Sequence, residues 1–205
     1  MTKSADEAES ARHRAKMVKR KAVQDAEVAE KKIEKGLLIV HTGTGKGKST
    51  AAFGLALRML GRGKRVGVVQ FIKGAWHSAE RDALARFGEQ VAWHTMGEGF
   101  TWETQDLERD VAAAERAWAK ARELMADPAF ALVILDELNI ALRYDYLDLA
   151  TVVAALRERR HDLHVVVTGR NAKPELVAAA DLVTEMTLVK HHFAAGVKAQ
   201  PGIEY

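Results

Sequence analysis

The stretch HTGTGKGKST, residues 41–50, places a flexible and positively charged turn between two apolar runs. Residues 36–40 (GLLIV) precede it and predict a buried strand, and residues 51–60 (AAFGLALRML) follow it and predict a helix. A glycine-rich turn from a strand into a helix presents backbone N–H groups at the start of the helix, where anions bind. The turn therefore predicts an α/β fold with a phosphate-binding loop.

Two phosphate-loop patterns compete for this stretch, and the first is the dinucleotide-binding pattern. It requires G-x-G-x-x-G and an acidic residue about 20 positions further on. Gly43 and Gly45 fit this pattern, but Lys48 occupies the position of the third glycine. The next predicted strand ends near Gln70, which is not acidic. A dinucleotide site is therefore disfavoured.

The Walker A pattern, G-x-x-x-x-G-K-[ST], fits better, because Gly47, Lys48 and Ser49 match its end. Its first glycine is replaced by Thr42, and Gly43 follows one place later. In such a loop the N–H groups surround phosphate oxygens, the lysine adds a positive charge and the hydroxyl can bind Mg²⁺. The predicted ATP-binding residues are Gly43, Thr44, Gly45, Lys46, Gly47, Lys48, Ser49 and Thr50.

The rest of the chain alternates apolar strand patterns with helical patterns. The predicted strands are residues 37–41, 65–71, 91–95, 131–136, 164–168 and a weaker 182–189. The predicted helices are residues 48–60, 79–87, 104–126, 147–159 and 174–180. Continuous apolar strands between helices predict a mostly parallel sheet with helices on both faces. We expect one RecA-like P-loop domain over residues 36–205.

Residues 1–35 are expected to form a separate helical extension. Residues 5–34 contain neither Gly nor Pro and are rich in Ala, Glu, Lys and Arg, which favours a helix. The apolar positions of this segment form only a thin stripe; they are Met17, Val18, Val23, Val28 and Ile33. The extension is either a solvent-exposed, partly frayed helix or a cover over the active site.

Composition narrows the class of protein. The chain of 205 residues has no cysteine, which excludes disulfides, thiolate metal sites and a cysteine nucleophile. No apolar run approaches the roughly 20 residues of a membrane span, and no signal-peptide pattern is present, so we expect a cytoplasmic protein without a membrane partner. The 31 basic residues nearly balance the 28 acidic ones. Nucleic acid is therefore compatible with the charge but not indicated by it.

Two acidic residues follow another apolar run, FALVIL at residues 130–135. Asp136 and Glu137 lie where this predicted strand ends, which is the edge at which sites open in parallel sheets. Both are candidate Mg²⁺ ligands, directly or through water, and an Asp-Glu pair here indicates the RecA-like branch of P-loop proteins. The strand HVVVT ends near Arg170, which is either a phosphate contact or an exposed residue at a helix start.

An aromatic segment, MGEGFTWETQD at residues 96–106, follows the third predicted strand. Its Phe100 and Trp102 are flanked by glycine and polar residues. From composition alone, these two aromatic side chains are either buried or form a flat surface for a ligand.

The combined motifs resemble the P-loop type of corrinoid adenosyltransferase, which acts on cob(I)alamin or cob(I)yrinic acid a,c-diamide. The motifs that carry the resemblance are TGTGKGKSTAAFG, VGVVQFIKG, GFTWET, VILDEL, YDYL, VVVTGR and VKHHFAAGVKAQPGIEY. They extend from about Gly36 to Tyr205. The family commonly has Asn at the position of Thr44 and Thr at the position of Ser49.

The resemblance implies a specific reaction. Co(I) of a corrinoid attacks the 5′-carbon of ATP, which forms the Co–C bond and releases triphosphate, with Lys48 and Mg²⁺ stabilising the leaving group. Glu137 is the expected metal ligand, with Asp136 nearby. Phe100 and Trp102 are expected to displace the lower axial ligand of the corrinoid. The resemblance also implies a homodimer and an electron donor such as a flavoprotein.

The alternative is a RecA-like ATPase module that acts on nucleic acid. The basic isoelectric point, about 9.1, favours it. However, residues 1–35 contain ten Lys and Arg against seven Asp and Glu, which is a small excess for a nucleic-acid-binding arm. The reaction products separate the two hypotheses, because an ATPase releases ADP and phosphate.

Overall fold

The computed structural model describes residues 3–72, 78–96 and 106–204. Phe100 and Trp102 therefore lie outside the described residues. The chain divides into two compact units, Met1–Glu34 and Lys35–Tyr205. We describe each unit by itself.

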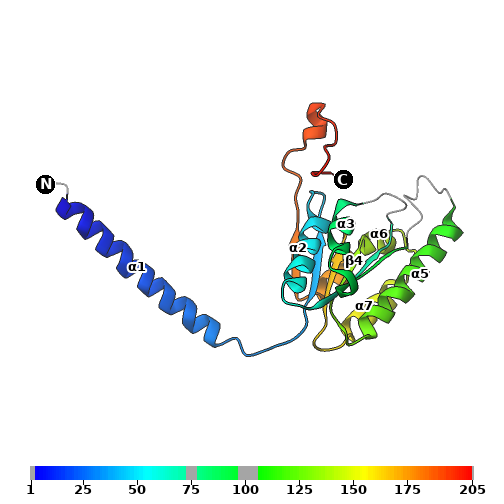
Figure 1. The fold of residues 1–205 in the computed structure, drawn as a ribbon, viewed down its shortest axis with the longest axis horizontal. Coiled ribbons are helices and arrows are strands. Elements are labelled where there is room, and N and C mark those ends of the chain that lie inside the picture. Colours follow the sequence, from blue (N-terminus) through cyan, green and yellow to red (C-terminus); the bar gives the residue numbers. More distant parts are fainter. Residues whose placement is uncertain (1–2, 73–77, 97–105, 205) are drawn as a thin grey trace. The chain divides into compact units, whose positions relative to one another are not determined.

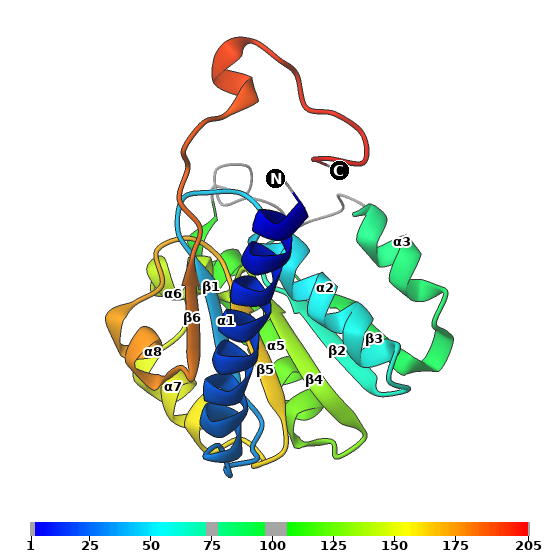
Figure 2. The same cartoon turned by 90° about the vertical axis from the view of Figure 1, so that its left-hand side faces the viewer.

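The second unit is built on a six-stranded sheet (Figure 1), and its strand order β3-β2-β4-β5-β1-β6 can be followed in Figure 2. Its strands are β1 (Leu38–Thr42), β2 (Arg65–Gln70), β3 (Val91–Thr95), β4 (Phe130–Asp136), β5 (His164–Thr168) and β6 (Leu182–Glu185). Every described strand pair is parallel. The strands therefore all end at one edge, which we call the carboxyl edge.

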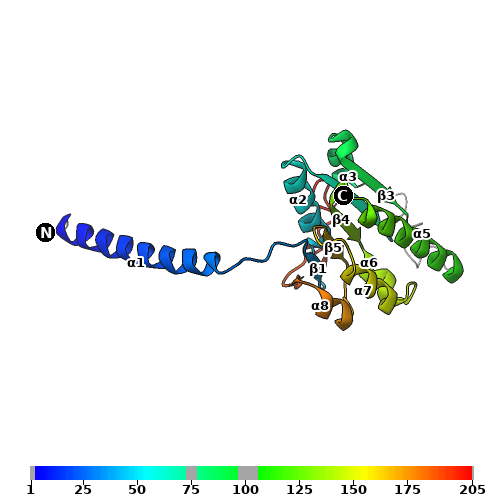
Figure 3. The ribbon, with the colours of Figure 1, turned by 90° about the horizontal axis from the view of Figure 1, so that it is seen from below.

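Helices cover both faces of this sheet, as Figures 2 and 3 show. They are α2 (Lys48–Leu60), α3 (Ala79–Ala85), α5 (Leu107–Ala126), α6 (Leu138–Arg143), α7 (Leu149–Arg157) and α8 (Pro174–Ala179), and 3₁₀ turns lie at Gly88–Gln90 and His192–Ala195. Successive strand residues point to opposite faces. Val68 accordingly packs in the cluster with α2 and α3, whereas Val69 packs with α5, α6, α7 and α8.

The predicted α/β P-loop fold is confirmed, and the sheet is more regular than the predicted "mostly parallel" arrangement. One strand, β5, lies between the P-loop strand β1 and the acidic strand β4. All the predicted strands and helices are present; several are shorter at one or both ends, and β4 begins one residue earlier than predicted. Helix α6 was not predicted, because its six residues follow β4 almost directly and have no start signal such as the proline at the first turn of the equally short α8.

The first unit consists of helix α1 (Lys3–Ala29) and the residues that follow it. Its side chains, where described, are exposed, and Lys21 forms an ion pair of 2.6 Å with Asp25 one turn later. The helix ends five residues before the predicted end at residue 34. None of the helices in the described part of the chain is long and apolar enough to span a membrane.

Candidate functional site

The loop between β1 and α2 is a tight glycine-rich turn. Gly43 and Gly47 have positive φ angles of 95° and 103°, which favour glycine. Met186, just after β6, packs against this loop: its carbonyl accepts a 2.6 Å hydrogen bond from the N–H of Gly45. A Cβ atom on Gly43 would lie only 2.4 Å from the same carbonyl oxygen. The loop therefore needs glycine for its dihedral angles and for its close packing.

Lys48 begins α2 and lies over this loop. The residue is buried, at 7% exposure, and its ammonium donates hydrogen bonds to the carbonyl oxygens of Gly43, at 3.0 Å, and Gly45. These two hydrogen bonds link the Lys48 side chain to the loop and place its positive charge there.

Burial lowers the pKa of Lys48 below its usual value, and the positive charges of Arg170 and Lys46 act in the same direction. The carboxylate of Glu137 opposes this shift. A bound polyanion would stabilise the protonated, positively charged form of Lys48. The electrostatics of the site therefore match a phosphate ligand.

The other predicted loop residues differ in exposure. Thr44, Lys46 and Thr50 are exposed, whereas Ser49 is half-buried at the first turn of α2. The ammonium of Lys46 pairs with the carboxylate of Glu204, near the C-terminus. This hydrogen bond is the main cause that lowers the pKa of Glu204. The C-terminal segment therefore contacts the phosphate loop, which the sequence did not indicate.

The two predicted acidic residues have different surroundings. Asp136 is fully buried at the end of β4, and its carboxylate accepts hydrogen bonds from Gln70 Nε2, at 3.0 Å, and Thr168 Oγ1, at 2.8 Å. Glu137 is half-buried and has a positive φ of 62°. Its N–H donates a 3.0 Å hydrogen bond to the same Thr168 hydroxyl. The structure therefore separates a fixed, buried carboxylate from a more accessible one.

The glycine after β5 makes room for the side chain of Glu137. Gly169 has a φ of 125°, and a Cβ atom there would lie 3.1 Å from Oε2 of Glu137 and 2.9 Å from Cβ of Asn139. The amide of Asn139 donates a 2.9 Å hydrogen bond to the carbonyl of Gly169. Two chain segments, residues 137–139 and Gly169, therefore meet closely around the carboxylate of Glu137.

The available donors fit Mg²⁺ better than a transition metal. Within the described ranges, no group of three or more His, Cys, Asp and Glu side chains could hold a metal ion. Mg²⁺ needs no such group, because it is usually held by one or two carboxylates, phosphate oxygens and water. The Ser49 hydroxyl and the carboxylates of Glu137 and Asp136 are hard oxygen donors of this kind.

The remaining predicted residue, Arg170, is exposed and lies within electrostatic reach of Lys48. The turn that contains it is tied to the P-loop strand, because the N–H of Ala172 donates a 3.0 Å hydrogen bond to the Thr42 hydroxyl. This position is compatible with both alternatives stated for Arg170, a phosphate contact and an exposed side chain.

Several polar residues at the carboxyl edge were not among the predicted site residues. Gln70 and Thr95 end β2 and β3 and are paired in the sheet, and Gln70 is also paired with Asp136. The signal that could have found them is a polar residue at the end of an apolar strand, in RVGVVQ and VAWHT.

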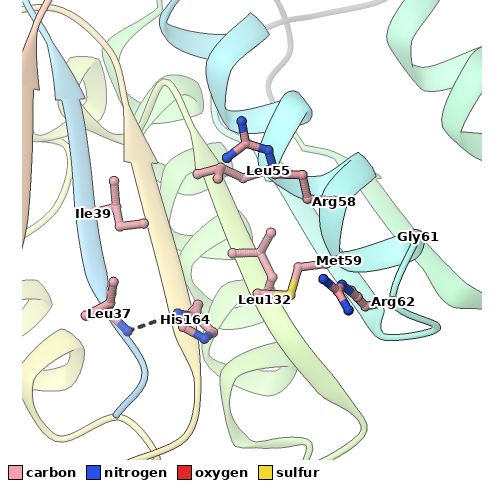
Figure 4. A pocket seen from close by; sticks show the side chains of 9 residues that line it. All are labelled: Leu37, Ile39, Leu55, Arg58, Met59, Gly61, Arg62, Leu132 and His164. Carbon is pink, nitrogen blue, oxygen red and sulfur yellow. Dashed lines mark hydrogen bonds between the residues drawn. The ribbon is translucent and has the colours of Figure 1, made fainter. Parts of the chain in front are cut away.

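A pocket of 480 Å³ lies near the other edge of the sheet (Figure 4). It is lined by Leu37, Ile39, Leu55, Arg58, Met59, Gly61, Arg62, Leu132 and His164. His164 lies at the start of β5 and accepts a 3.1 Å hydrogen bond from the N–H of Leu37. Because this pocket lies at the C-terminal end of α2, it is not the site formed by the P-loop.

Comparison with known proteins identifies similar sequences over most of the chain. Residues 34–205 match the family described as "ATP:corrinoid adenosyltransferase BtuR/CobO/CobP", and residues 1–28 match "Cob(I)alamin adenosyltransferase N terminal". A corrinoid adenosyltransferase of Pseudomonas aeruginosa is 57% identical over 194 residues, which cover 95% of this chain and 96% of that protein. One from Escherichia coli K12 is 51% identical over 181 residues, covering 88% and 91% of the two chains.

Among solved structures, the flagellar accessory protein FlaH from Methanocaldococcus jannaschii matches this chain. Its TM-score is 0.48 and its sequence identity is 13%, and the match covers 75% of this chain and 72% of that chain.

Proposed function

The chain belongs to the ATP:corrinoid adenosyltransferase family, and on this premise we propose how its residues divide the work of the reaction. The enzyme transfers the adenosyl group of ATP to a corrinoid in cobalamin biosynthesis or salvage. The family match therefore replaces the alternative of an ATPase that acts on nucleic acid.

The P-loop binds the triphosphate of ATP, which is the leaving group when the corrinoid cobalt attacks the 5′-carbon. Negative charge grows on the triphosphate as the C–O bond breaks, so the loop N–H groups and Lys48 stabilise the transition state more than the ground state. The observation that carries this proposal is the buried residue Lys48, whose ammonium bonds two carbonyl oxygens of the glycine-rich loop. The nucleophile is the cobalt, so no protein group has to act as a general base.

Ser49 and Glu137 hold Mg²⁺ beside the triphosphate, where the ion would supply further positive charge to the leaving group. Asp136 contributes through water, because both of its oxygens already accept hydrogen bonds from protein groups. The half-buried position of Glu137 and its electrostatic interaction with Lys48 support this division.

Replacing Glu137 with glutamine should raise the Mg²⁺ concentration needed for half-maximal activity about 10- to 100-fold, because the amide keeps the shape of the side chain but loses its charge. A Mg²⁺ titration of the initial rate measures this. Glu158→Gln, at an exposed position after α7, is the matched control. An unchanged titration in Glu137→Gln would remove Glu137 from the metal site.

Residues 1–35 form an extension that covers the corrinoid, and residues 36–205 form the catalytic domain. The match of residues 1–28 to a family-specific N-terminal segment supports a role in this reaction. Its exposed apolar side chains, including Val18, Val23 and Val28, offer contact area for a large, partly apolar ligand.

Deleting residues 1–30 should raise the KM for the corrinoid about tenfold, which corresponds to about 1.4 kcal/mol of lost binding free energy. The affinity for ATP should change little, since the phosphate loop lies in the other unit. Steady-state kinetics with each substrate varied in turn measure both effects. Equal losses for ATP and corrinoid would contradict the proposed role.

We also propose that the enzyme is a homodimer and receives electrons from a flavoprotein, and the family match is the only support for these two points. The experiment that tests the function supplies ATP, Mg²⁺ and chemically reduced cobalamin. We expect triphosphate and a light-sensitive alkylcobalt product. ADP and phosphate would instead indicate an ATPase.

A further inference from the structure

A continuous chain of hydrogen bonds, partly buried at β3 and fully buried from Gln70 onward, crosses the carboxyl edge from β3 to β5. On β3, the indole Nε1 of Trp93 donates to Gln70 Oε1, at 3.1 Å, and to Thr95 Oγ1, at 3.3 Å. Thr95 Oγ1 also donates to Gln70 Oε1, at 3.1 Å. From Gln70 the chain continues through Asp136 to Thr168. The sheet register pairs Gln70 with both Thr95 and Asp136, so the contacts follow from the strand order.

The hydrogen bonds of this chain converge on the carboxylate of Asp136 from both sides. Gln70 Oε1 receives the hydrogens of Trp93 and Thr95, so its Nε2 is the group that faces Asp136. The Thr168 hydroxyl accepts the N–H of Glu137, and its own hydrogen therefore goes to Asp136. Asp136 is thus an acceptor at both oxygens, which fixes the rotation of its carboxylate.

This arrangement reaches the proposed metal site through Glu137. The Thr168 hydroxyl bonds both the carboxylate of Asp136 and the backbone N–H of Glu137, whose left-handed φ of 62° needs support from its surroundings. A shift of Asp136 would move Thr168, and with it the backbone that directs the side chain of Glu137. On the other side of Asp136, the amide of Gln70 donates a hydrogen bond to the carboxylate, and Gln70 itself is buried, at 3% exposure.

We propose that Gln70, held by Trp93 and Thr95, is a positioning residue that orients Asp136 and Glu137 for the metal–triphosphate complex. This inference rests on the proposed metal site and extends it to residues that do not touch ATP. Groups that orient metal ligands from outside typically contribute 10- to 100-fold in metal affinity or activity. The alternative is that these hydrogen bonds only satisfy buried polar groups and so contribute to stability alone.

The test measures metal binding separately from turnover. Mn²⁺ replaces Mg²⁺ in the enzyme–ATP complex, and its dissociation constant is read by electron paramagnetic resonance. Gln70→Leu should raise this constant about 10- to 100-fold and lower kcat, with little change in the KM for chemically reduced cobalamin. Val69→Ala, the neighbouring buried residue on the other side of β2, is the control for lost stability. It should lower the thermal unfolding temperature without changing Mn²⁺ binding.

A milder pair of variants keeps the test decisive if Gln70→Leu fails to fold. Thr95→Val removes one donor to Gln70, and Thr95→Ser keeps it. Mn²⁺ binding should weaken in Thr95→Val and stay normal in Thr95→Ser. Equal affinities in the two variants would overturn the proposal.

Glu137→Gln distinguishes failure of this inference from failure of the proposed metal site. If Glu137→Gln weakens Mn²⁺ binding but Gln70→Leu folds and binds Mn²⁺ normally, only the positioning role is wrong. If Glu137→Gln itself binds Mn²⁺ normally, the metal site and the positioning role are both wrong. A rise in the cobalamin KM of Gln70→Leu with unchanged Mn²⁺ binding would also overturn the proposal.

Discussion

Replacing Lys48 with alanine should lower the rate of adenosyl transfer about 100- to 1,000-fold, the loss expected when one preorganised charged donor to a leaving group is removed. Lys48 is buried against the phosphate loop, and its ammonium contacts two loop carbonyls. Alanine removes both the positive charge near the triphosphate and the contacts that close the loop. The two losses act on the same step, because charge on the triphosphate is largest in the transition state.

The measurement is the initial rate with ATP, Mg²⁺ and cob(I)alamin supplied directly, so that reduction of the cobalt does not contribute. Circular dichroism and thermal unfolding show whether the variant is folded. Lys64→Ala removes an exposed lysine after α2 and should leave the rate unchanged. Near-normal turnover of Lys48→Ala would contradict the assignment of residues 43–50 as the triphosphate site.

The fold and the phosphate loop could be predicted because their signals are local. The strands from Leu38, Arg65 and His164 are apolar runs, and each is followed within a few residues by a turn. In the loop, the glycines at positions 43 and 47 predict positive φ angles, because glycine adopts such angles readily, and both residues have them. A parallel sheet then follows, since helices separate the strands.

The division between Asp136 and Glu137 could not be predicted, because it depends on contacts between distant residues. The partners of Asp136, Gln70 and Thr168, are 66 and 32 positions away in the chain. Only the strand order brings them together, and no local pattern specifies that order. The pairing of Lys46 with Glu204 across 158 positions is another contact of this kind.

The two aromatic residues of the corrinoid side, Phe100 and Trp102, are assigned by family resemblance alone, but the described residues fix both ends of their segment. Before it, the N–H of Met96 donates a 3.1 Å hydrogen bond to the carbonyl of Gln70, where β3 ends. After it, Asp106 caps α5 by accepting a 3.1 Å hydrogen bond from the N–H of Arg109. Met96 therefore lies at the carboxyl edge, which also carries the phosphate loop.

Phe100→Ala and Trp102→Ala should lower the rate about 100-fold or more when the reaction starts from Co(II) and a biological reductant. Each ring offers about 150–250 Å² of apolar area. At about 25 cal/mol per Å² this corresponds to about 4–6 kcal/mol, enough to offset the loss of a weak axial ligand from the cobalt. Removing that ligand makes Co(I) accessible to a mild donor, so the loss falls on the reduction step.

The same two variants should keep most of their activity when Co(I) is supplied ready-made, because the phosphate loop and metal ligands are unchanged. The ratio of the two rates is therefore the decisive quantity, and Lys48→Ala provides the contrast, since it should lose activity in both assays. An equal loss in both assays, or loss of folding in Phe100→Ala and Trp102→Ala, would instead indicate that these side chains are part of the packed core. A selective loss would place the corrinoid chemistry on this segment and the triphosphate chemistry on the loop at residues 43–50, as two separable functions of one sheet edge.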